Sequence, residues 1–92
     1  MDFEWDESKR LSILRKHGID FLDAALVFGN ETIEWIDESE DYGEERVIAL
    51  GRLELTVLRI TYTSRSDAIR IISAQRANKH DQKNYYNAIK PR

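Results

Sequence analysis

Five arginines fall in or beside segments whose residue pattern predicts β-strands: Arg46, Arg59, Arg65, Arg70 and Arg76. On neighbouring antiparallel strands such side chains can converge on one face, where each guanidinium grips phosphate oxygens through two hydrogen bonds. This arrangement suits an RNA backbone, because attack by a 2′-hydroxyl places extra negative charge on the phosphate, and that charge must be stabilised. The alternative is that the arginines are surface residues that pair with acidic side chains.

Arg59 stands apart from the other four. It lies one position from the apolar Leu58 and Ile60, so we expect it on the opposite face of the sheet from them. We interpret it as structural or solvated. The candidate phosphate-binding or transition-state groups are therefore Arg46, Arg65, Arg70 and Arg76.

A second set of residues has side chains that can move a proton or stack on a base. Lys16 and His17 come at the end of a predicted helix, and Tyr85 and Tyr86 lie in a later one. A cation at the end of a helix also fits a purely structural role, because it faces the negative end of the helix dipole. We keep Lys16, His17 and Tyr85 as candidates for proton transfer or stacking.

Other kinds of catalytic site find little support. The chain has no cysteine, and its two histidines, His17 and His80, lack the close spacing of metal ligands. Its four glycines are isolated, so they form no phosphate-binding loop. We therefore expect chemistry without a metal and without a cofactor.

The charge is divided unevenly along the chain. Residues 1–45 carry fourteen acids and four bases, whereas residues 46–92 carry three acids and ten bases, which together give the net charge of −3. The basic half offers a patch for phosphate and the acidic half repels it. The alternative is that the two halves pair with each other in the folded protein.

The first third of the chain predicts a short strand and two helices. Residues 3–5 alternate apolar and polar, Asp6 is placed to cap a helix, and Gly18 is placed to end it. Asp20 caps a second helix, which Gly29 and Asn30 end. We expect the two helices to form a hairpin packed on one side of the sheet, with core residues Leu14, Phe21, Ala24, Ala25 and Phe28.

The remainder predicts strands followed by a final helix. Residues 31–45 contain eight acids and no base, which indicates a solvated loop with room for one strand at 32–36. Strands are expected at 46–50, 55–63 and 69–74, and Asn78 caps the last helix. The prediction is one α+β domain over residues 1–92, with an antiparallel sheet of three to four strands. The acidic N-terminus, the absence of a long apolar stretch and the lack of cysteine favour a cytoplasmic protein.

Read together, these segments resemble the BrnT toxin family over nearly the whole chain. The residues that carry the resemblance are Phe3–Asp6, Lys9, Lys16–Ile19, Phe21, Ala24, Ala25, Val27, Phe28, Gly43–Arg46, Tyr62, Thr63, Arg65, Arg70–Ala74, Arg76 and Ala77. The resemblance implies a RelE-like fold and a ribonuclease toxin that acts against translation. It also implies neutralisation by a BrnA-type antitoxin in a hetero-oligomer, with DNA contacted only through the antitoxin.

The chain departs from the family pattern at two informative positions. After Ser73 and Ala74 the family usually has Arg, where this chain has Gln75 followed by Arg76, so either activity is weakened or Arg76 replaces the missing group. Asp81 stands where Glu is usual, which is consistent with the same capping role. Two other readings stay open: a catalytically weakened module that binds the antitoxin, and a plain nucleic-acid-binding domain.

Overall fold

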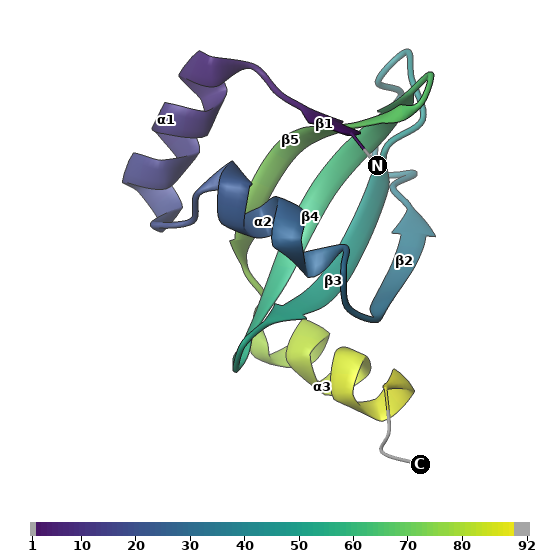
Figure 1. Cartoon of the computed structure of the whole chain (residues 1–92). Helices are drawn as coiled ribbons and strands as arrows, with labels where there is room; N and C mark the ends of the chain where they lie inside the picture. Colours follow the sequence, from purple (N-terminus) through teal and green to yellow (C-terminus); the bar gives the residue numbers. More distant parts are fainter. Residues whose placement is uncertain (1, 90–92) are drawn as a thin grey trace.

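A five-stranded sheet lies at the centre of the protein, as seen in a computed structural model that describes residues 2–89 (Figure 1). In chain order the elements are β1 (Asp2–Glu4), α1 (Glu7–His17), α2 (Phe21–Val27), β2 (Thr32–Ile36), β3 (Val47–Leu53), β4 (Thr56–Arg65), β5 (Ala68–Arg76) and α3 (Lys79–Ala88). The strand order is β1-β5-β4-β3-β2. The predicted α+β class is confirmed.

The sheet is larger than predicted, and it is mixed. β2 to β5 pair antiparallel, but β1 runs parallel to the start of β5. The prediction of an antiparallel sheet of three to four strands holds for β2 to β5, but the sheet has five strands, because the predicted short strand near the N-terminus joins it as the parallel strand β1. A three-residue strand carries no sign of its partner in its sequence, and its parallel pairing depends on the two helices that return the chain across the sheet.

Helix α2 lies across one face of the sheet, which we call the helix face, and α1 packs against β5 beside it (Figure 1). Phe21, Ala24 and Val27 of α2 are fully buried there. They pack with apolar residues of β4 and β5, such as Ile60 and Ala74. Burial of these side chains is the main stabilising contribution available to a domain of this size.

The predicted caps of the helices are confirmed. The side chain of Asp6 accepts a hydrogen bond from the amide of Lys9 at 3.0 Å, and Gly18 ends α1 in the left-handed conformation, with φ of 70°. Asp20 accepts from the amide of Leu22 at 3.0 Å. These side chains satisfy backbone groups that a helix end leaves without an internal partner.

The predicted arrangement of the two helices needs correction. α1 packs mainly against β5 and α2 against the three strands β3, β4 and β5, so the helices rest on the sheet more than on each other. Leu14 and Phe28 are only partly buried, whereas Val27, absent from the predicted stripe, is fully buried. The stripe is therefore shifted by about one residue at its end, because α2 stops at Val27.

The opposite face of the sheet is covered at one end by α3. Tyr85 and the residues Leu50, Val57 and Ala77 form a second, smaller core under this helix. Asn78 caps α3 as predicted, accepting a hydrogen bond from the amide of Asp81 at 2.8 Å. We call the part of this face that α3 leaves uncovered the open face.

Candidate functional site

Three of the predicted arginines lie at one end of the sheet. β4 is antiparallel to both neighbours, so the end of β4 meets the starts of β3 and β5. Arg46 immediately precedes β3, Arg65 is the last residue of β4, and Arg70 is the third residue of β5. We call these three residues the arginine corner.

Arg70 is held between two neighbouring strands. Its register partners are Thr63 on β4 and Glu4 on β1, and its Nη1 lies 3.7 Å from Oε1 of Glu4. The Thr63 side chain is buried, and its hydroxyl donates to the carbonyl of Glu45 at 2.7 Å. This hydrogen bond connects Glu45, the residue before Arg46, with Thr63, the register partner of Arg70.

Arg46 is positioned by an aromatic ring and an acid. Its guanidinium lies 4.0 Å from the centre of the Tyr42 ring, and its Nε donates to Glu44 at 3.2 Å. The Tyr42 hydroxyl in turn donates to Asp37 at 3.1 Å. A guanidinium stacked on an aromatic ring keeps N–H donors free for the oxygens of an anion.

Arg65 is exposed, and among residues 2–89 it forms no ion pair. It stands before the turn to β5, where Ser66 has a positive φ of 51°. Within the arginine corner, Arg46 and Arg70 are paired with Glu44 and Glu4, whereas Arg65 has no carboxylate partner among residues 2–89.

From the corner, polar side chains continue along the open face. The pairs Arg59–Gln75 and Thr61–Ser73 are successive same-face rungs of β4 and β5, next to the rung of Thr63 and Arg70. Arg59 lies on the opposite face from Leu58 and Ile60, as predicted. It nevertheless shares its face with Arg65, because the two are an even number of positions apart on one strand. The interpretation of Arg59 as lying outside the site is therefore not supported.

Arg59 is fixed by a buried acid. Its Nη1 lies 2.8 Å from Oδ2 of Asp81, whose side chain is only 7% exposed. The guanidinium also lies 5.7 Å from the centre of the Trp35 ring. Asp81, expected only to help cap α3, thus connects that helix to the open face.

Arg76 does not join the arginine corner. It pairs with Leu58, a residue of the helix face, and its Nη1 donates to the carbonyl of His17 at 3.0 Å. The prediction that Arg76 shares a face with Arg70 is wrong. Arg76 instead joins Lys16 and His17 in a second basic group at the end of α1, so these three residues are separated from the corner.

The structure also contradicts an exposed stacking role for Tyr85. Its side chain is 4% exposed, and its hydroxyl donates to the carbonyl of Glu31 at 3.0 Å. Burial raises the pKa of this phenol above its ordinary value, which further disfavours proton transfer. Its neighbour Tyr86 is 45% exposed.

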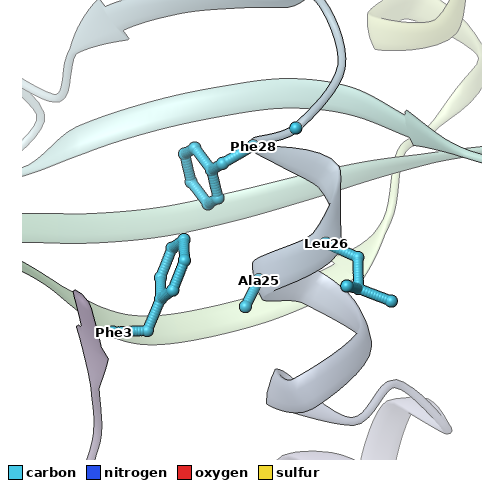
Figure 2. A pocket seen from close by; sticks show the side chains of 5 residues that line it. Phe3, Ala25, Leu26 and Phe28 are labelled. Atoms are coloured by element: carbon cyan, nitrogen blue, oxygen red, sulfur yellow. The ribbon is translucent and has the colours of Figure 1, made fainter. Parts of the chain in front are cut away.

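One hollow opens on the helix face, away from these arginines. Phe3, Ala25, Leu26, Phe28 and Gly29 line it (Figure 2). It contains no side chain that could hold a phosphate or move a proton. Across residues 2–89, no group of three or more His, Asp or Glu side chains is placed to hold a metal ion.

The family of the chain follows from a comparison with family models. Residues 5–81 match the model described as the ribonuclease toxin, BrnT, of type II toxin–antitoxin systems. The chain belongs to the BrnT family. The match includes the whole arginine corner and ends at Asp81, so most of α3 lies beyond it. No curated protein matches the chain.

Membership of the BrnT family makes this chain a toxin of a type II system, with an antitoxin as partner. No helix in the described part of the chain is long and apolar enough to span a membrane.

Sequence reasoning missed Glu4, Tyr42 and Arg59 as neighbours of the site. For Arg59 the signal was present, because its spacing from Arg65 places both on one face of a regular strand. Glu4 reaches Arg70 only through the parallel pairing of β1 and β5. Tyr42 lies in the acidic loop, where no periodic pattern indicates a contact.

Proposed function

We propose that this BrnT-family chain is an endoribonuclease that cleaves RNA without a metal ion at the arginine corner. The observation that carries the proposal is the grouping of Arg46, Arg65 and Arg70 at one end of the open face. Three guanidinium groups there can contact the oxygens of one phosphate and stabilise the charge that develops in the transition state. The role of Lys16, His17 and Arg76 is then to attract the RNA strand, not to act on its bonds.

The chemistry requires a proton acceptor beside the phosphate. The 2′-hydroxyl of the preceding ribose attacks phosphorus and loses its proton, while the bond to the 5′-oxygen breaks and that oxygen takes a proton from solvent. The products are a 2′,3′-cyclic phosphate and a 5′-hydroxyl. Glu4 is the carboxylate paired with Arg70, and we assign it the role of accepting the proton.

The rest of the open face extends the site to a neighbouring nucleotide. Arg59 lies four residues before Thr63, the register partner of Arg70, which is about 13 Å along a strand at ~3.3 Å per residue. At this distance Arg59 and Arg70 can contact the same phosphate only if both side chains bend toward each other. We therefore assign Arg59 to the neighbouring phosphate of the RNA strand. Thr61, Ser73 and Gln75 supply hydrogen-bonding groups between them.

The proposal includes the biological setting implied by the family. Cleavage of RNA inhibits translation in the cytoplasm, and a BrnA-type antitoxin neutralises the toxin in a hetero-oligomer and makes the contacts with DNA. We also propose the RelE-like fold that the family resemblance implies. Expression of the chain alone in a bacterium tests this setting: growth should arrest, and co-expression of the antitoxin should restore it. Normal growth with folded protein present would contradict it.

A second candidate function is a catalytically weakened module that binds the antitoxin. The observation in its favour is Gln75, which takes the place of the family's usual Arg and faces Arg59 on the open face, whereas Arg76 lies on the other face and cannot substitute. Gln75→Arg separates the two functions. If the chain is weakened at this position, the variant should cleave RNA at least about tenfold faster; an unchanged rate would show that this guanidinium is not required.

A further inference from the structure

Helix α2 is apolar on two faces. Phe21, Ala24 and Val27 are fully buried against the sheet, whereas Leu22 and Leu26, side by side on the outer surface, are 57% and 62% exposed. A helix at the surface of a domain ordinarily carries polar residues on its outer face, and one that is apolar all round is ordinarily buried. Within residues 2–89 nothing covers this outer face.

The surface beside Leu26 is hollowed to a volume of about 300 Å³. Figure 2 shows the side chains of Phe3 and Phe28 on one side of the hollow and Leu26 on the helix beside it; the two phenyl rings lie 5.6 Å apart. This volume is at the lower end of the range for ligand pockets, roughly 300–1,000 Å³. No lining side chain is polar, so the hollow suits apolar side chains better than a polar small molecule, which needs groups to orient it.

The charge around this surface selects the kind of partner. Helix α2 carries no Lys, Arg or His, and the hydroxyl of Tyr62, whose ring packs against Phe28 of the hollow, donates to Glu34. Asp23 on α2 and Asp2 on β1 are exposed. Such a surface repels nucleic acid and attracts a chain that carries positive charge.

We infer that Leu22, Leu26 and the hollow form the docking surface for a segment of the antitoxin whose apolar side chains are flanked by Lys or Arg. A helix or extended segment that inserts apolar side chains into a groove is a common mode of peptide recognition. The inference rests on the antitoxin partnership in the proposed function. Because the surface lies on the helix face and the arginine corner on the open face, docking of the antitoxin and cleavage of RNA use separate residues.

The test measures the Kd of the complex with purified antitoxin, the product of the gene adjacent to the toxin gene, for the double variant L22S/L26S. Loss of apolar anchors at the centre of an interface typically weakens binding about tenfold or more, which is the expected result. RNA cleavage and the cooperative thermal transition should be unchanged, because neither side chain is buried in the core. The matched control is Leu55→Ser in the β3–β4 turn, where Leu55 is 88% exposed, and it should leave the Kd within about twofold.

Unchanged affinity in a folded L22S/L26S variant would overturn the inference. If the variant does not fold, hydrogen exchange in the unaltered complex decides the matter: amides of α2 should exchange more slowly when the antitoxin is bound, and unaltered exchange there would overturn the inference. Asp23→Lys adds a test of charge, because it should weaken binding and unaltered affinity would contradict the basic partner.

Two further outcomes assign the surface otherwise. A stable dimer of the toxin alone that L22S/L26S dissociates would show that a second copy occupies the surface, which contradicts the inference. Failure of the unaltered toxin to bind any antitoxin would instead contradict the proposed partnership, and this result differs from selective loss of binding in the variant.

Discussion

Arg70 and Arg76 are six positions apart on β5, a spacing that places two side chains on the same face of a regular strand. They lie on opposite faces because one extra residue, Ile72, enters the pairing of β5 with β4 between the partners of Thr61 and Tyr62. A one-residue shift in register reverses the face of every side chain beyond it. The alternation of apolar and polar residues over 69–74 is broken at the adjacent Ile71 and Ile72, which is a local sign of the extra residue. The face of Arg76 was predicted wrongly because the strand was taken as regular.

This reversal makes Arg70 and Arg76 a matched pair for mutagenesis. Arg70→Ala should fold normally and reduce the rate of RNA cleavage roughly 10²–10³-fold, because it removes charge stabilisation in the transition state. Arg70→Lys should restore little, since an ammonium cannot make the two-pronged contact. Single-turnover cleavage by purified variants is the measurement. Arg76→Ala should retain the single-turnover rate at saturating RNA within about threefold, because its guanidinium lies away from the reacting phosphate; the reverse result would place the site at the end of α1.

At the scale of elements, the caps were the most predictable features, because a capping side chain acts within three residues of its own position. Asp6, Asp20 and Asn78 all cap the helices predicted for them. The strands β3 to β5 were recognised from their apolar and β-branched residues, although β3 extends to Leu53, beyond the predicted end at residue 50. The pairing of β1 with β5 depends on contacts between residues distant in sequence, so no local sequence pattern predicts it.

Asp20 gives a pH-dependent test of the α1–α2 connection. The pKa of Asp20 is lowered, first by the hydrogen bond from the Leu22 amide and then by the Arg10 guanidinium, which it contacts at 3.0 Å. The folded protein therefore favours the carboxylate. This contribution to stability is complete above the ordinary pKa of 3.8 and is lost as pH falls through the lower folded value.

Asp20→Ala should lower the free energy of unfolding by about 1 kcal/mol at pH 7, the usual cost of losing a cap. Urea unfolding across a pH series is the measurement. The difference between parent and variant should persist down to about pH 5 and shrink below the ordinary pKa of 3.8. A difference that grows on acidification would mean that the carboxylate is not the stabilising form.

The packing of α2 on β3 depends on a glycine. A Cβ at Gly51 would collide with the side chains of Val27 and Thr32, so Gly51→Ala should lower the free energy of unfolding by about 1–3 kcal/mol, the usual cost of overpacking. Gly29→Ala is the control, because a Cβ there would lie 3.4 Å from the carbonyl of Leu26. It should change stability by less than about 1 kcal/mol. Equal effects of the two substitutions in urea unfolding would argue against the close approach of α2 and β3.

At the scale of the whole molecule, the uneven charge along the chain becomes an uneven charge in space. Exposed carboxylates such as Asp2 and Asp23 lie on β1 and α2, whereas the arginine corner, Arg59 and the group at the end of α1 lie on or beside β4 and β5. The separation is incomplete, because Arg46 pairs with Glu44 and Arg70 pairs with Glu4, two carboxylates of the acidic half. Three of the four predicted phosphate-binding arginines, Arg46, Arg65 and Arg70, lie together at one end of the sheet, and their contact with phosphate stays a prediction. Arg76 lies apart from them because face, and not sequence position, decides which side chains meet.

The most direct test of the account is cleavage of a defined single-stranded RNA by the purified chain in the presence of excess EDTA. The account predicts cleavage at an unchanged rate, with a 2′,3′-cyclic phosphate on one product and a 5′-hydroxyl on the other, and loss of this activity in Arg70→Ala. Cleavage that EDTA abolishes, or cleavage that survives the removal of Arg46, Arg65 and Arg70 together, would contradict the proposal that the arginine corner is the active site.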